Sequence, residues 1–255
     1  MVIQAIKKIF DWLKGSKKAS PQPLVDPPLP ITDDGIPVPP LDLIYLVVGT
    51  REPVGFIEGG KKIAHQGIVD ALHKHQLDLN DFQAVLDFGC GCGRLMRHWK
   101  SLTKPRLYGT DYNPVLIEWC KSNLPFAQFQ VNQLEPPLNY SDSQFDFIFA
   151  GSVFTHFPEA LQFAWLTELR RILMHGGYLM ITTSGEHYAK NPPLPLQKRF
   201  YAGQFVAIQE DRAGTNLCGA YHSEKYVREN LTRHFAVVDF IPTGWDTQDI
   251  VLLRK

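Results

Sequence analysis

The residues with the clearest chemical potential form the glycine-rich run Asp87-Phe88-Gly89-Cys90-Gly91-Cys92-Gly93, which follows a short apolar segment predicted to be a strand. Glycine allows the backbone to turn sharply and allows a ligand to approach it closely. Dinucleotide-binding turns space their glycines as Gly-x-Gly-x-x-Gly, whereas these glycines alternate and Arg94 takes the place of the last one. A carboxylate at Asp87 would repel a pyrophosphate, so the run favours a ligand with a cationic ammonium or sulfonium group.

A second carboxylate, Asp111, lies at the end of the next predicted strand. A carboxylate in this place can accept hydrogen bonds from both hydroxyls of a ribose, and its separation from the glycine turn is close to the ~20 residues expected for such a pair. Each feature has a simpler alternative. The glycines could form a plain strand-to-helix connection, and Asp111 could cap the helix that begins near Pro114, a role for which Asn113 competes. The order and spacing of the two features together favour a ligand site.

Two histidines are candidates for acid–base chemistry. His156 ends a polar loop, Ser152–His156, that follows a buried apolar strand. Because open parallel sheets bind ligands at the carboxyl ends of their strands, this loop is expected to face the reacting group. The pKa of an unperturbed histidine lies near neutrality, which suits a general base; alternatively, His156 caps the next helix or bonds buried backbone. His222 ends a long segment, residues 184–222, which is interpreted either as a lid over an acceptor or as a surface excursion with its own small core.

Strand-like and helix-like segments alternate through the rest of the chain, which predicts a mostly parallel sheet with helices on both faces. The last two strands are too close in sequence for a crossover helix, so they must pair antiparallel. The predicted strands are 84–88, 106–111, 126–131, 145–150, 178–183, 236–241 and 249–253. The predicted helices are 60–74, 95–101, 114–123, 158–173 (ended by Gly176-Gly177) and 223–233, with 43–48 as either helix or strand.

The segments Val85–Arg94, Asp111, Phe145–Ser152 and Leu169–Thr183 resemble the class I (Rossmann-like) S-adenosylmethionine-dependent methyltransferases. The resemblance extends over roughly residues 80–255. It implies an α/β fold with a mostly parallel seven-stranded sheet, helices on both faces and an antiparallel C-terminal strand. It also implies S-adenosyl-L-methionine as the cofactor.

The same resemblance assigns roles to individual residues. Asp87 and the glycines would flank the methionine part of the cofactor, Asp111 would hold the ribose, and the segment 130–134 would contact adenine. The family often has Asp where this chain has Asn132, whose amide can still donate and accept. Arg94 is expected to meet a carboxylate as a planar fork. The expected cofactor-binding set is Asp87, Gly89, Cys90, Gly91, Gly93, Arg94, Asp111, Tyr112, Asn132, Gln133, Leu134 and Ser152.

The predicted activity is methyl transfer to a small-molecule or glycan acceptor, at oxygen, with His156 or His222 as the base. Alternatives are an N-methyltransferase of a small molecule and a non-catalytic binding protein that keeps the fold. A nicotinamide-dependent oxidoreductase is disfavoured by the glycine spacing, by Asp87 and by the antiparallel end. Nucleic-acid amino-methyltransferases are disfavoured because Gly151-Ser152-Val153-Phe154 stands where they carry Asn- or Asp-Pro-Pro-Tyr. No cysteine follows a proline, as cytosine carbon methylation would need, and Cys90-x-Cys92 lies inside the turn and gives no zinc pattern.

The composition and the N-terminal region predict the compartment of the protein, its membrane contacts and its domain organisation. The formal net charge is zero over 255 residues, so no overall field draws the protein to nucleic acid. The 4 cysteines show no disulfide framework, which indicates a cytoplasmic protein, and no apolar run reaches the ~18 residues of a membrane span. Residues 1–18 are predicted to form a basic amphipathic helix, which either lies on an anionic membrane surface or docks on its own domain or a partner. Residues 19–41 are a proline-rich linker or surface strap, and residues 42–255 are the predicted methyltransferase domain, with 184–222 as a substrate-side insertion. The sequence indicates no oligomeric state.

Overall fold

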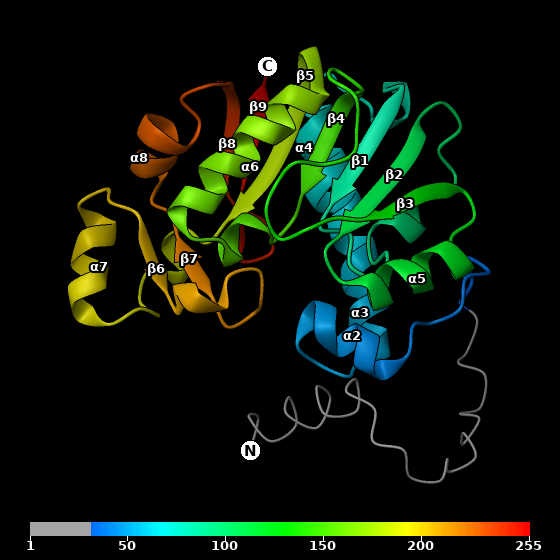
Figure 1. Ribbon diagram of the computed structural model, residues 1–255, viewed down its shortest axis with the longest axis horizontal. Coiled ribbons are helices and arrows are strands. Elements are labelled where there is room, and N and C mark those ends of the chain that lie inside the picture. Colours follow the sequence, from blue (N-terminus) through cyan, green and yellow to red (C-terminus); the bar gives the residue numbers. More distant parts are fainter. Residues whose placement is uncertain (1–31) are drawn as a thin grey trace, which may run out of the picture.

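The computed structural model describes residues 32–255, and a seven-stranded sheet forms their centre (Figure 1). The strand order is β3-β2-β1-β4-β5-β9-β8. Strands β1 to β5 pair in parallel, and β9 is antiparallel to both of its neighbours. The strands are β1 (Ala84–Phe88), β2 (Arg106–Asp111), β3 (Ala127–Val131), β4 (Phe145–Ala150), β5 (Leu173–Thr183), β8 (Ala236–Trp245) and β9 (Gln248–Arg254). The predicted fold class is thereby confirmed, including the antiparallel end.

The central strands are buried because helices cover both faces of the sheet, as parallel sheets require. In β4, Phe145 and Ile148 point into one core, whereas Phe147 and Phe149 point into the other. The first core is closed by α6 (Glu159–Ile172), and α5 (Pro114–Asn123) contributes to the second. The uninterrupted apolar sequence of β4 is therefore explained by burial on two sides.

The helices α2 (Leu41–Val48) and α3 (Pro53–Lys62) lie at the carboxyl edge of the sheet, below the strands in Figure 1. Residues 43–48, which the sequence leaves open between helix and strand, belong to α2. The helix predicted over 60–74 begins earlier, with α3, since proline suits a first helical turn. It continues through a π-helical stretch (Ile63–Val69) into α4 (Asp70–His73).

Two other predicted helices differ from the structure in type or in the cause of their end. The helix expected over 95–101 is only a short 3-10 turn, Met96–Trp99. The helix predicted over 158–173 is α6 (Glu159–Ile172), but its end is set by Leu173, which pairs with Phe145 and begins β5, and not by the Gly176-Gly177 pair. Tertiary pairing thus ends this helix before the glycines.

Residues 32–40 lie over the short turn that follows the glycines and are held there by Arg97. The Arg97 side chain is 1% exposed and pairs with Asp34 through two bonds of 2.8 and 3.1 Å. It also donates to the hydroxyl of Thr32 and the carbonyl of Ile36. The charge of Arg97 is therefore buried and paired, although the residue lies in a basic stretch of the sequence.

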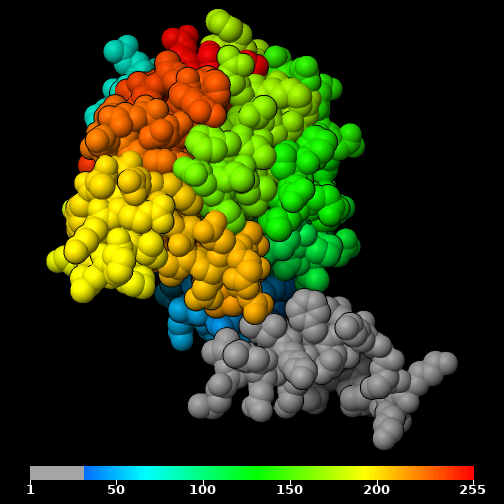
Figure 2. All heavy atoms as spheres, turned by 60° about the vertical axis from the view of Figure 1, so that its left-hand side comes forward, coloured from blue at the N-terminus to red at the C-terminus, as the bar shows by residue number. Residues whose placement is uncertain are grey.

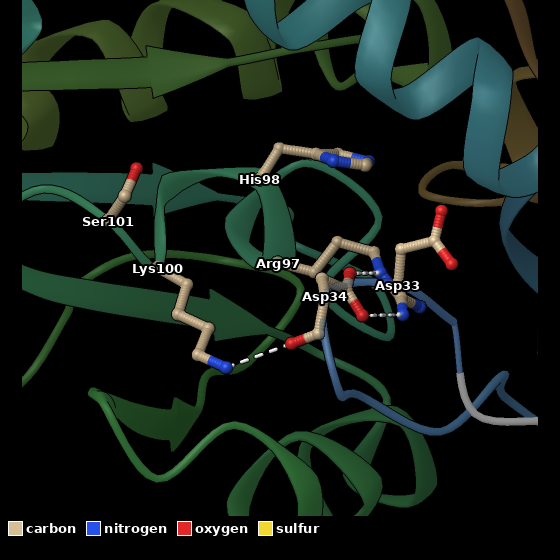
Figure 3. Close-up of a pocket in the computed structure, with 6 residues that line it drawn as sticks. All are labelled: Asp33, Asp34, Arg97, His98, Lys100 and Ser101. Carbon is tan, nitrogen blue, oxygen red and sulfur yellow. Dashed lines mark hydrogen bonds and ion pairs between the residues drawn. The ribbon is translucent and has the colours of Figure 1, made fainter.

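A pocket of about 440 Å³ lies beside this ion pair and is lined by Asp33, Asp34, Arg97, His98, Lys100 and Ser101 (Figure 3). Arg97 reaches the Asp34 carboxylate here, and the Lys100 ammonium donates to the Asp34 carbonyl. The pocket contains none of the predicted cofactor or acceptor residues.

Residues 184–222 form a lobe beside the sheet, drawn in yellow and orange in Figures 1 and 2. The lobe contains α7 (Leu194–Tyr201) and the antiparallel pair β6 (Val206–Ile208) and β7 (Gly219–Tyr221). It has a small core of its own, made by Ala189, Phe200, Val206 and Tyr221. The interpretation as an excursion with its own core is thus correct for the packing.

The chain returns from this lobe to the sheet through a short helical segment. This segment consists of α8 (Glu224–Tyr226) and a π-helical turn, Val227–Leu231, where the sequence predicts one helix over 223–233. Within residues 32–255, no helix is both long and apolar enough to cross a membrane. The predicted helix 1–18 and most of the proline-rich segment 19–41 lie outside the described residues.

Candidate functional site

The glycine turn connects β1 to the 3-10 turn, and its three glycines all have left-handed backbones. Their φ angles are +79° at Gly89, +56° at Gly91 and +74° at Gly93. The amides of Gly89 and Cys90 both donate to the Thr110 carbonyl, at 2.7 and 3.0 Å, which fixes the turn against β2. Side chains are disfavoured at these φ values, so the backbone explains the glycines.

Three other elements approach the turn too closely for side chains on it. A Cβ on Gly89 would lie 2.4 Å from Val153 of the loop after β4. One on Gly91 would lie 2.8 Å from Val47 of α2, and one on Gly93 would lie 2.3 Å from Leu124. The approach of α2 is not anticipated from the sequence, because the apolar run 43–48 does not indicate which element it packs against.

Asp87, one residue before the end of β1, is a buried carboxylate without a partner among the described residues. The residue is 2% exposed, and its Oδ2 has no hydrogen bond to any described residue. Burial, together with the nearby negative charge of Asp111, raises the pKa of Asp87 from 3.8 to about 7. Because an unpaired buried charge is costly, this position suits a cationic ligand group.

Asp111 stands on the neighbouring strand end, beside the glycine turn. Its Oδ2 accepts the Gly91 amide at 3.0 Å and its Oδ1 accepts the Asn113 amide at 2.8 Å. Burial raises the pKa of Asp111 despite these bonds. Asn113 makes the helix cap itself by accepting the Val115 amide. The cap role is thus taken, and the second lone pairs of the Asp111 carboxylate remain for a ligand.

The predicted adenine segment follows β3. The Asn132 side chain accepts from the Thr110 hydroxyl at 2.7 Å and donates to the Gln133 carbonyl at 2.6 Å. Leu134 and Tyr112 expose 36% and 44% of their surface. A Cβ on Gly214 would lie 2.6 Å from Leu134 and 3.8 Å from Tyr112, so residues of the 184–222 lobe reach this edge.

Arg94 follows the glycines and lies against α3. Its Nε donates to the Phe56 carbonyl at 3.3 Å, and its guanidinium lies 5.9 Å from the centre of the Phe56 ring. Burial lowers the pKa of Arg94, and no described carboxylate forms an ion pair with it. A guanidinium and a carboxylate without charged partners therefore stand on the two sides of the glycine run.

Ser152 follows β4 with a left-handed backbone, φ +57°. Its amide donates to the Thr182 hydroxyl at 2.7 Å, and its hydroxyl donates to Gln248 Oε1 at 3.2 Å. Such strain in a non-glycine residue persists where the surroundings enforce it, often at functional sites. Thr182 and Gln248, which hold this turn, are not identified from the sequence.

His156 lies on the loop after β4, half-buried and hydrogen-bonded at one ring nitrogen. Its Nδ1 lies 2.8 Å from the Cys218 carbonyl oxygen. A carbonyl only accepts, so Nδ1 carries the hydrogen and Nε2 keeps its lone pair. Burial lowers the pKa of His156. The residue is thus held as a neutral imidazole with a basic nitrogen.

His222 lies in a different environment, behind this loop. It is fully buried, and its Nε2 lies 3.0 Å from Gln162 Oε1. Burial lowers the pKa of His222 to about 3. A side chain with no exposed surface cannot contact an acceptor in this conformation, so the geometry leaves His156 as the candidate base.

The site therefore brings together Asp87, the glycine turn, Asp111 and Asn132 at the carboxyl ends of β1, β2 and β3. Ser152 and His156 follow at the end of β4. No group of three or more His, Cys, Asp or Glu residues within 32–255 is arranged to hold a metal ion. The four cysteines are free and buried.

Residues 86–181 match the family described as Methyltransferase domain. This range begins in β1, before the glycine turn, and extends into β5, so it includes the turn, Asp111, Asn132, Ser152 and His156.

Solved structures of methyltransferases share the fold. An S-adenosylmethionine-dependent methyltransferase from Mesorhizobium loti is 14% identical, with a TM-score of 0.56 over 73% of this chain and 96% of that one. One from Methanosarcina mazei is 20% identical, with a TM-score of 0.53 over 72% and 96%. The 1,6-didemethyltoxoflavin-N1-methyltransferase of Burkholderia thailandensis, solved with 1,6-didemethyltoxoflavin and S-adenosylhomocysteine, is 19% identical, with a TM-score of 0.51 over 91% and 93%.

Proposed function

We propose that this chain is a class I S-adenosylmethionine-dependent methyltransferase that methylates an oxygen atom of a small-molecule or glycan acceptor, with His156 as the base. The observation that carries the cofactor part is the unpaired buried carboxylate of Asp87 beside the left-handed glycine turn. The observation that carries the acceptor part is the free Nε2 of His156.

The residues around the turn fit the cofactor group by group. Asp87 would pair with the ammonium of its methionine part, and Arg94 would pair with the carboxylate as a planar fork. Asp111 would accept from the ribose hydroxyls, since each of its oxygens has one lone pair left. Asn132 to Leu134 would line the adenine, with Tyr112 and Leu134 as apolar surface. When bound, the cofactor supplies a methyl group activated by a positively charged sulfur.

The acceptor residues would act at the neighbouring strand end. An acceptor hydroxyl placed against Nε2 of His156 would give up its proton to that nitrogen as its oxygen is methylated. The lowered pKa keeps the imidazole unprotonated near neutral pH. Val153, which packs on Gly89, would help to exclude water from the space between the cofactor and the acceptor.

Isothermal titration with S-adenosylhomocysteine, compared with NADH, tests the cofactor part. We expect binding of the first compound only, and loss of that binding in Asp111→Ala. Transfer of tritiated methyl groups from S-adenosylmethionine to a panel of phenols, sugars and amines tests the acceptor part. Labelled phenols or sugars that disappear in His156→Ala support the proposal. Labelled amines that persist in His156→Ala would instead support N-methylation. Binding of S-adenosylhomocysteine without methyl transfer to any compound of the panel would support the non-catalytic alternative.

A further inference from the structure

We infer that residues 184–222 position His156 for its reaction, with the Cys218 carbonyl, Gln162 and His222 as the groups that hold it. The inference rests on the proposed role of His156 as the base, and it assigns to the lobe a task other than covering the acceptor. It follows from a chain of hydrogen bonds that joins the lobe to the loop after β4.

The first link acts on His156 itself. An imidazole in water exchanges between two neutral tautomers, whereas the Cys218 carbonyl, 2.8 Å from Nδ1, selects the tautomer with a free Nε2. The main chain of His156 is held by the same segment, because the Gly214 amide donates to the His156 carbonyl at 2.8 Å. Gly214 and Cys218 belong to one turn, in which the Cys218 amide donates to the Thr215 carbonyl. One short segment of the lobe therefore fixes the ring and backbone of His156 together.

The second link holds the loop on both sides of His156. Gln162, on α6, donates through Nε2 to the carbonyls of Phe154 and Phe157, both at 2.9 Å. These two bonds bracket His156 and use both amide hydrogens. The Gln162 amide orientation is thereby determined, because two carbonyls can only accept.

The third link returns to the lobe. Since Oε1 of Gln162 is an acceptor, Nε2 of His222 must donate to it across 3.0 Å. His222 directly follows β7, and its amide donates to the Ser184 carbonyl at 2.9 Å, where the lobe begins. The ring is enclosed by Phe205 and Tyr226, and its low pKa of about 3 keeps it neutral. His222 therefore acts as a constant neutral donor that locks Gln162 in place, and it is a positioning residue.

Ring-nitrogen spectra test this chain of bonds without an acceptor. Long-range proton–nitrogen correlation on nitrogen-15 histidine-labelled protein shows which nitrogen of each ring is protonated, and single His→Asn or His→Gln variants assign the signals. In the full-length wild-type protein we expect His156 protonated at Nδ1 and His222 at Nε2. A wild-type His156 protonated at Nε2 would overturn the inference at once.

Substitutions then test the transmission. We expect His222→Leu and Gln162→Leu to shift His156 from the single tautomer protonated at Nδ1 toward a mixture of the two neutral tautomers. His222→Gln should restore the wild-type signal, since a glutamine amide can donate from the same place. Gln197→Leu is the matched control, because Gln197 also bridges two carbonyls, those of Lys190 and Pro192, but inside the lobe and away from His156.

Different results would refute the hydrogen-bond chain and the proposed function. If His156 keeps its tautomer in folded His222→Leu and Gln162→Leu, the inference is wrong. If either variant does not fold, Gln162→Glu replaces it, because a carboxylate accepts from His222 but cannot donate to Phe154 or Phe157. Calorimetry with S-adenosylhomocysteine on the same wild-type sample reports on the proposed function independently, so absent binding with the expected tautomers would refute that function and not the hydrogen-bond chain.

Discussion

Because the carboxylate of Asp87 is buried and unpaired, we expect the affinity for the cofactor to depend on pH. The Asp87 pKa of about 7 means that the apo protein holds this carboxyl largely protonated in mild acid. Only the ionised form can pair with a ligand ammonium. The apparent dissociation constant is the intrinsic one divided by the competent fraction, so affinity for S-adenosylhomocysteine should rise roughly 50- to 100-fold between about pH 5 and pH 7.5.

Calorimetric titration across this range measures the effect directly. Binding near pH 6 should also release a proton, which appears as a dependence of the binding heat on the ionisation enthalpy of the buffer. Asp87→Asn should bind weakly and with little pH dependence. Asp249→Asn is the control, because Asp249 is another buried carboxyl whose pKa burial raises, but it lies at the start of β9 and already accepts the Thr243 amide.

The same carboxyl has the opposite effect on the stability of the apo protein, which falls as the pH rises. A folded pKa above the unfolded 3.8 means that the folded state binds the extra proton, so the contribution of Asp87 to stability is fully present below about pH 4 and is lost as the pH rises toward about 7. Asp87→Asn should remove this loss. Affinity that stays constant with pH, or an asparagine variant that binds like the wild type, would refute the assignment of Asp87 to the ligand ammonium.

Two further substitutions, each with a matched control, probe the surroundings of the site. Gly89→Ala should abolish S-adenosylhomocysteine binding in calorimetry. It should also lower the free energy of unfolding in urea by about 1–3 kcal/mol, because it adds a clash with Val153 to a strained φ. Gly49→Ala, at a similar φ but in open space, should keep binding. Arg97→Met should destabilise the fold by about 3–5 kcal/mol in urea, since it leaves Asp34 without its buried partner, whereas Arg51→Met at an exposed pair should cost under about 1 kcal/mol. The Arg97 contact also holds the pKa of Asp34 near 2, so its contribution should persist above pH 4 and disappear as the pH falls toward 2; equal acid sensitivity of wild type and Arg97→Met would contradict this.

The sequence predicts the sheet and the cofactor edge because these depend on local patterns. A strand buried on both faces appears as an apolar run, as at Phe145–Ala150, and a left-handed turn appears as glycine. The carboxylates Asp87 and Asp111 then mark neighbouring strand ends. Each of these signals is contained within a few residues.

The features that sequence reasoning missed depend on contacts between distant segments. Arg97 belongs to a basic stretch, and only the return of residues 32–37 over it buries its charge. Val47 reaches the glycine turn through the packing of α2, for which 43–48 gives no directional signal. His222 is a histidine in a polar segment, yet packing against Phe205 and Tyr226 removes it from solvent and leaves it a supporting role.

A crystal structure of the full chain with S-adenosylhomocysteine would show how the cofactor is held. We expect the ligand ammonium within hydrogen-bonding distance of Asp87, the ribose hydroxyls on Asp111 and the sulfur facing the loop that carries His156. Saturated crystals with no ligand density at the glycine turn, or with the ribose away from Asp111, would contradict this arrangement.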